Sequence, residues 1–166
     1  MKATLRITDA DSVLNPEENL DIAYSTSKAL RFAVNSKKVI TVAVKHNIII
    51  PVAALANLVN SQVLKIAVPF PFTLDSALFR VGDKAVTTAA KAATVQTKVS
   101  GTNTTGGTVE LVSADLTPTG ATKALSAITG ANTGAAGGTI EIAVSGVTAF
   151  AEGNGWFECT VTELSE

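Results

Sequence analysis

The sequence predicts a mainly β protein, with an α+β first half over residues 1–85 and an antiparallel β-sandwich or jelly-roll-like module over residues 86–166. Three observations support this fold class. Short runs of alternating apolar and polar residues recur along the chain, as strands with one buried face require. Polar or glycine-containing turns separate these runs. The best helical spacing of apolar side chains falls in a single stretch, residues 52–60.

The first predicted strand is residues 4–8, where apolar and polar side chains alternate cleanly. Residues 15–18 read Asn-Pro-Glu-Glu, which is typical of a helix start. Asparagine can cap the helix, proline suits the first helical position and carboxylates favour the first turn. Leu20, Ile22 and Tyr24 follow with a spacing of two. We therefore expect a short helix or turn and then a strand.

A hairpin is the clearest element expected in the first half. Residues 29–34 and 39–44 are strand-like runs, and the polar residues 35–38 join them over a length that suits a turn. Beyond the hairpin we expect a buried strand that Pro51 ends, a short helix and a further strand, at residues 48–50, 52–60 and 63–68.

Residues 69–72 read Pro-Phe-Pro-Phe. The two prolines hold the backbone extended and remove hydrogen-bond donors, so this segment should lie at a sheet edge or crossing. Phe70 and Phe72 would then point to the same side. Two interpretations stay open: the rings anchor a contact with another subunit, or they cap the core of the first domain. The boundary between the two domains is placed near residue 85.

The second half reads as short strands separated by turn residues, which is typical of a sandwich. The expected strands are residues 94–99, 108–112, 124–128, 139–144 and 156–164. One phrase occurs twice, because Gly106-Gly107-Thr108 returns as Gly137-Gly138-Thr139. It could record an internal duplication. We adopt the simpler interpretation, that glycine pairs and threonine are favoured where strands begin.

Charged residues make up only 16% of the chain, below the roughly 25% of an average domain, so the surface must be largely uncharged. Residues 1–85 carry ten basic and seven acidic side chains, a charge of +3, and residues 86–166 carry three and seven, a charge of −4. The split favours a basic half seated on an acidic partner, although chance explains it equally well. A pI of about 5.8 argues against nucleic acid, and the longest uncharged run, residues 46–64, is too polar to span a membrane.

No combination of residues predicts catalysis or a metal site. Cys159 lies on the same side of an alternating strand as Phe157 and Val161, so we expect it in the core. His46 sits at a strand break and is interpreted as a turn residue. One cysteine and one histidine cannot complete the usual zinc ligands, and the acidic residues 9–21 lack the spacing of an EF-type calcium loop. We predict no enzymatic activity and no cofactor.

Carbohydrate binding is a slightly stronger candidate than nucleic-acid binding, because sugars stack on aromatic faces and residues 149–156 include both Phe150 and Trp156. This segment could form the lip of a sugar site. The interpretation that we favour is structural. It places a turn at Asn154-Gly155 and the Trp156 ring in the core.

The chain is rich in Thr, Ala, Gly and Val, poor in aromatic residues and without a possible internal disulfide. In this style of composition, and in its small β module, it resembles the decoration (cement) and head-fibre proteins of tailed bacteriophages. The resemblance rests on residues 95–139 and 139–162, about half the chain. It implies a homo-oligomer, with a trimer favoured, bound outside the capsid at junctions between major capsid protein subunits.

We therefore expect a non-catalytic virion structural protein on the outer capsid surface, which stabilises the capsid by bridging neighbouring subunits. The residues expected to contact a partner are Arg31, Lys37, Lys38, Phe70 and Phe72. The alternative is a phage tail or fibre module that binds a host-surface glycan and depends on Trp156. Neither expectation involves nucleic acid or a membrane.

Overall fold

The computed structural model describes residues 20–24, 30–34 and 38–164 of the 166-residue chain. The chain divides into two compact units, Met1–Val42 and Ala43–Glu166. The described residues are mainly β, with two short 3-10 turns and no α-helix among them. The strand expected at residues 4–8 and the helix start expected at residues 15–18 lie outside the described residues.

In the described part of the first unit, three strands form one antiparallel sheet in the order β1-β2-β3. The strands are β1 (Leu20–Tyr24), β2 (Leu30–Val34) and β3 (Lys38–Val42). Phe32 lies opposite Ile22 on one side and Ile40 on the other. The strand through Leu20, Ile22 and Tyr24 and the hairpin that follows it are thus confirmed.

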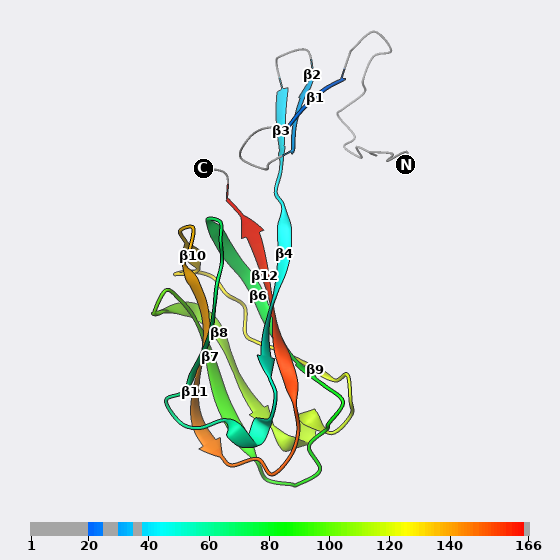
Figure 1. The fold of residues 1–166 in the computed structure, drawn as a ribbon, viewed down its shortest axis with the longest axis vertical. Coiled ribbons are helices and arrows are strands. Elements are labelled where there is room, and N and C mark those ends of the chain that lie inside the picture. The colour runs from blue at the N-terminus through cyan, green and yellow to red at the C-terminus, as the bar shows by residue number, and fades with distance from the viewer. Residues whose placement is uncertain (1–19, 25–29, 35–37, 165–166) are drawn as a thin grey trace. The chain divides into compact units, whose positions relative to one another are not determined.

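The second unit contains two antiparallel sheets that pack as the layers of a β-sandwich-like fold (Figure 1). The first sheet has the order β10-β6-β12-β4, with β9 also paired to β6. Its strands are β4 (Lys45–Val52), β6 (Phe72–Val81), β9 (Thr122–Ala124), β10 (Thr133–Gly134) and β12 (Gly155–Glu163). The second sheet has the order β5-β11-β7-β8. Its strands are β5 (Val63–Ala67), β7 (Ala92–Val99), β8 (Thr102–Val112) and β11 (Thr139–Thr148).

The core lies between the two sheets and follows from strict alternation along the strands. On β12, Phe157, Cys159 and Val161 are fully buried, as the sequence predicts. The Phe157 ring packs edge-to-face on Phe79 of β6, with the ring centroids 5.0 Å apart. Burial raises the pKa of the Cys159 thiol to about 12. The thiol is therefore part of the packing, as expected.

The predicted boundary near residue 85 does not match the division of the chain. β4, β5 and β6 precede residue 85, yet β4 and β6 pair with β12, and β5 pairs with β11. Each of the two sheets is therefore made of segments from both sides of that point. The change in composition near residue 85 marks a loop, in which the Val86 N–H donates to the Leu116 carbonyl at 2.9 Å.

The helix expected over residues 52–60 is also corrected. Val52 is the last residue of β4, and the helical part is one 3-10 turn, η1 (Leu55–Asn57). Leu55 and Leu58 are buried, but the Leu55 N–H donates to the Gly153 carbonyl at 2.8 Å. A tertiary hydrogen bond thus replaces the helical one, and the apolar spacing reflects a loop folded onto the core. The α+β character predicted for the first half is not found in its described residues.

The second half matches the expected strands unevenly. β7 and β11 cover the strands predicted at residues 94–99 and 139–144, and β12 covers the strand predicted at residues 156–164 except for its last residue. The turn predicted over residues 100–107 is much shorter, since β8 already begins at Thr102. The strand predicted at residues 124–128 reduces to the end of β9. The second of the two 3-10 turns is η2 (Ser113–Leu116), which follows β8.

Candidate functional site on the outer face of the β4-β12-β6 sheet

The outer face of the first sheet carries the chain's one tryptophan. Because Phe157 and Cys159 point inward, Trp156 and Glu158 on either side of Phe157 point outward. The favoured expectation that Trp156 lies in the core is therefore wrong. The strand register places Trp156 between Pro51 of β4 and Arg80 of β6.

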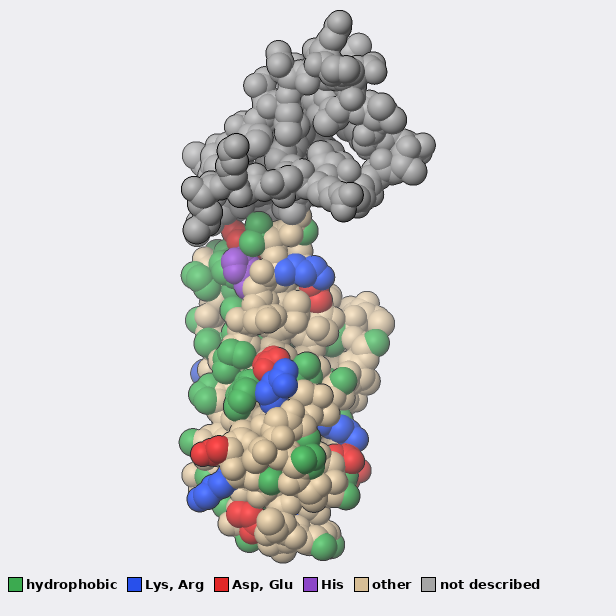
Figure 2. Space-filling view, turned by 90° about the vertical axis from the view of Figure 1, so that its right-hand side faces the viewer, with side chains coloured by type: hydrophobic (Ala, Val, Ile, Leu, Met, Phe, Trp, Pro, Cys, Tyr) green, Lys and Arg blue, Asp and Glu red, His purple; other side chains and the backbone are tan. Residues whose placement is uncertain are grey.

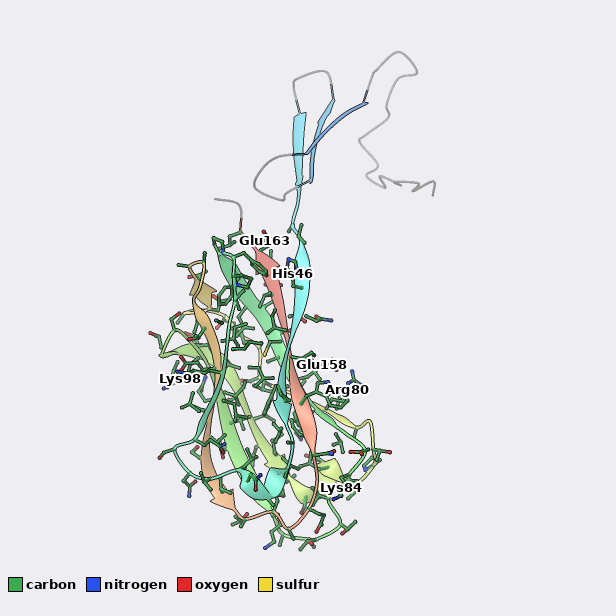
Figure 3. All side chains as sticks on the ribbon, viewed as in Figure 1. His46, Arg80, Lys84, Lys98, Glu158 and Glu163 are labelled. Carbon is green, nitrogen blue, oxygen red and sulfur yellow. The ribbon has the colours of Figure 1, made fainter. Side chains whose placement is uncertain are left out.

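An ion pair holds the tryptophan in place. The Arg80 Nε donates to Glu158 Oε1 at 2.6 Å, and its Nη2 donates to Oε2 at 3.2 Å. The indole Nε1 of Trp156 donates to the same Oε1 at 2.8 Å. Figure 3 shows the Arg80 and Glu158 side chains together on the outer side of the sheet. The hydrogen bonds from Arg80 and then from Trp156 lower the pKa of Glu158, so this carboxylate is ionised at neutral pH.

A surface hollow of about 500 Å³ lies beside this row of residues. Most of its wall is apolar or backbone, and Asp83 and Asn154 supply its polar groups. The residues that line it are Pro51, Val52, Ala53, Val81, Gly82, Asp83, Gly120, Asn154, Gly155 and Trp156.

The polar end of the hollow is held by the loops that follow β6 and precede β12. The Asn154 Nδ2 donates to Asp83 Oδ1 at 2.5 Å, and the Asn154 Oδ1 accepts from the Lys84 N–H at 3.1 Å. The backbone adds a hydrogen bond from the Gly82 N–H to the Asn154 carbonyl at 2.9 Å. The hydrogen bond from Asn154 lowers the pKa of Asp83. An ionised and exposed carboxylate therefore stands at the polar end.

This arrangement is suited to binding. Asp83 and Glu158 both have a lowered pKa, so each can accept hydrogen bonds but is a poor proton donor at neutral pH. The expected lip over residues 149–156 is smaller than predicted, because Phe150 is buried and only Asn154 to Trp156 reach the hollow.

The one histidine makes a different contact. His46 lies within β4 and not in a turn, and its Nε2 is 2.9 Å from Glu163 Oε2 (Figure 3). Its ring packs on Phe70 with the centroids 4.5 Å apart. His46 is thus engaged by Glu163 and Phe70, whereas the Cys159 thiol is buried in the core.

The five expected partner contacts fall in different settings. Phe72 is fully buried against Gly134, which corrects its assignment as a contact, and Phe70 is partly buried on His46. Arg31 lies in β2 opposite Thr41, and Lys38 lies in β3 opposite Val34. Lys37 lies outside the described residues.

A second surface, the β4–β5 edge, consists of exposed aliphatic side chains on the end strand of each sheet and the loop between them. Ile49 of β4 is 44% exposed, and Val63 of β5 is 43% exposed. The other members of the β4–β5 edge are Val59 and Ile66. β4 and β5 contact each other, and no described strand pairs with their outer edges. At the other end of the second sheet, β8 is bridged at one position, where Thr105 pairs with Gly130.

Comparisons with known proteins give no relative: no family model, curated protein or solved structure matches the chain. No helix within the described part of the chain is long and apolar enough to cross a membrane. Among the same residues, no group of three or more His, Cys, Asp or Glu side chains is placed to hold a metal ion.

Part of the site could have been found from the sequence. The strand predicted at residues 156–164, with Phe157 inward, already places Trp156 and Glu158 together on the opposite face. Arg80 could not be found in this way, because its position beside Glu158 depends on the pairing of β6 with β12 across 78 residues.

Proposed function

We propose that this protein is a non-catalytic structural protein of a virion, which decorates a capsid and stabilises it by bridging neighbouring capsid subunits. The observation that carries the proposal is the β4–β5 edge. Among the described strands, β4 and β5 each have one edge without a partner strand, and these two strands and the loop between them carry four exposed aliphatic side chains. Such a surface favours association, because a neighbouring chain can supply both backbone partners and apolar burial.

The rest of the surface fits a protein that is covered by neighbours or inert toward solvent. Figure 2 shows one face on which charged side chains are few and scattered among uncharged and hydrophobic ones. A self-associating copy would use the β4–β5 edge within a homo-oligomer, and the resemblance to phage decoration proteins favours a trimer. Modest contacts to a capsid would then be multiplied by symmetry and avidity.

The orientation inferred from charge needs revision. With the division after residue 42, the first unit has six basic and five acidic residues, a charge of +1. The second has seven and nine, a charge of −2. The difference in net charge between the two parts of the chain is therefore much smaller than the +3 and −4 counted on either side of residue 85. Arg31, Lys37 and Lys38 remain proposed capsid contacts on the first unit, without the support of a charge split.

The proposal is tested by size-exclusion chromatography with light scattering, followed by mixing with purified capsids of the virus that encodes the protein. We expect an oligomer that binds the capsids and raises their resistance to heat. Val63→Lys on β5 should disrupt the oligomer, because a charge would be buried in the interface. The matched control, Thr102→Lys, places the same side chain at an exposed position of β8, at the opposite end of the same sheet, and should leave the oligomer intact.

The possible failures can be separated. A monomer that does not bind capsids contradicts the proposed function. An oligomer that binds capsids but is unaffected by Val63→Lys keeps the function and contradicts the role of the β4–β5 edge.

A further inference from the structure

The strongest unassigned feature of the molecule is the hollow beside Trp156. We propose that it is a binding site for a neutral carbohydrate, with one sugar ring packed against the indole and a sugar hydroxyl bound by Asp83. This activity is additional to capsid decoration. The hollow shares strand β4 with the β4–β5 edge, but Trp156, Asp83 and Asn154 are not part of that edge.

The position of Trp156 is the first argument. It is the only tryptophan in the chain, and it stands on the outer face of the sheet next to Phe157, which is fully buried. Fixed aromatic rings with one exposed face are characteristic of recognition surfaces, because they offer contact area at low entropic cost.

The support behind the ring is the second argument. The indole N–H is held by Glu158, and two hydrogen bonds from Arg80 hold that carboxylate in turn. The ring is also flanked by Pro51 across the strand pair. A ring fixed by a chain of side chains keeps its geometry before a ligand arrives, as a preorganised site requires.

The composition of the hollow identifies the ligand class. A sugar ring has an apolar C–H face and hydroxyl groups at its rim, so it needs an aromatic surface and nearby hydrogen-bonding groups together. Trp156 and Pro51 supply the first, and the exposed Asp83 carboxylate beside Asn154 supplies the second. A volume of about 500 Å³ is within the range of small-molecule sites.

The charge of the hollow favours a neutral sugar over an acidic one. Asp83 is the one charged residue in its lining, and its lowered pKa keeps it negative at neutral pH. Arg80 is adjacent, but its guanidinium is engaged by Glu158. A uronic or sialic acid would thus meet a carboxylate in the lining, where the nearest further cation, Lys84, already faces Asp83, whereas a hydroxyl group would donate to Asp83.

The test uses the fluorescence of the full-length protein, in which Trp156 is the only indole. The probes are neutral oligosaccharides of glucose, mannose, galactose and N-acetylglucosamine, with sialylated and uronic-acid oligosaccharides as charged comparators. At least one neutral probe should shift the emission saturably at concentrations up to about 10 mM and protect the ring from acrylamide. A panel in which no neutral probe does so, or in which only acidic probes bind, overturns the proposal.

Variants then locate the binding by calorimetry. Trp156→Ala should abolish binding, and the conservative Trp156→Phe should weaken it by about tenfold while preserving the fold. Asp83→Asn should also weaken it by about tenfold. The matched control is Thr160→Ala, on the same strand and the same face but outside the hollow, and it should bind as the parent does. If Trp156→Phe melts as the parent does and still binds with unchanged affinity, the site is not at the hollow and the proposal is wrong.

Discussion

Glu152 joins two loops at one end of the second unit through four hydrogen bonds. Its Oε1 accepts from the Thr87 and Thr88 N–H groups at 2.7 and 2.6 Å and from the Thr87 hydroxyl at 3.0 Å. Its Oε2 accepts from the Thr88 hydroxyl at 3.0 Å. These bonds, the backbone donors of Thr88 and Thr87 first, lower the pKa of Glu152 from 4.5 to about 2. Glu152 thus fixes the junction of the two loops. The sequence around it, Ala-Glu-Gly, has no pattern that predicts this role.

Replacing Glu152 by Gln should lower the melting temperature at neutral pH, because the amide keeps one acceptor and loses the charge that strengthens these bonds. The folded pKa lies below the unfolded value, so the stabilising contribution is complete above about pH 4.5. It is lost as the pH falls through about 2. Thermal melts of the parent and Glu152→Gln should therefore converge as the pH approaches 2. Glu110→Gln, at an exposed position on β8, serves as the control; a difference for Glu152→Gln that persists unchanged to pH 2 would contradict the assignment.

At the scale of the elements, alternation predicted where strands lie but not how they pair. The repeated Gly-Gly-Thr phrase shows the limit. Thr139 begins β11, as expected, but Gly106 and Gly107 lie inside β8, where the pairing with β7 shifts register. Both glycines have positive φ. Gly106 lies against Ala127 and Ile128, and Gly107 lies against Thr97 and Ile128, so their surroundings come from other parts of the chain. A local pattern could not distinguish a strand start from a bulge.

The bulge predicts a contrast between two glycines of similar backbone conformation. Gly106 has φ +80°, and a Cβ there would lie 1.8 Å from the Ala127 carbonyl oxygen. Gly101 has φ +85° and nothing within 4 Å. Gly101→Ala should cost about 1 kcal/mol for the left-handed backbone alone. Gly106→Ala should cost at least about 2 kcal/mol more, because the strand must move.

Urea denaturation monitored by Trp156 fluorescence measures both changes in the free energy of unfolding. Equal losses for Gly106→Ala and Gly101→Ala would show that β8 does not approach the 126–128 segment as described.

At the scale of the whole molecule, the sequence predicted most strands and the buried side of β12. It placed the domain boundary near residue 85, after β4, β5 and β6, although these three strands belong to the second unit. A shift in composition can suggest a boundary, yet sheet pairing is decided by contacts between residues far apart in sequence. β12, for example, pairs with β4 across more than 100 residues and with β6 on its other side. The outward position of Trp156, by contrast, follows from alternation along β12 once Phe157 is placed in the core.

The boundary after residue 42 and the boundary expected near residue 85 predict different folding behaviour for two fragments of the chain. A fragment of residues 43–166 should unfold in one cooperative transition close to that of the full chain, because it keeps both sheets and the core described between them. A fragment of residues 86–166, the second domain expected from the sequence, should not fold. It lacks β4, β5 and β6, so β12 would lose both neighbours and the buried Phe79, Leu74 and Val81 would be missing from the core. Circular dichroism melts decide between them: a cooperative transition for residues 86–166 would restore the boundary near residue 85.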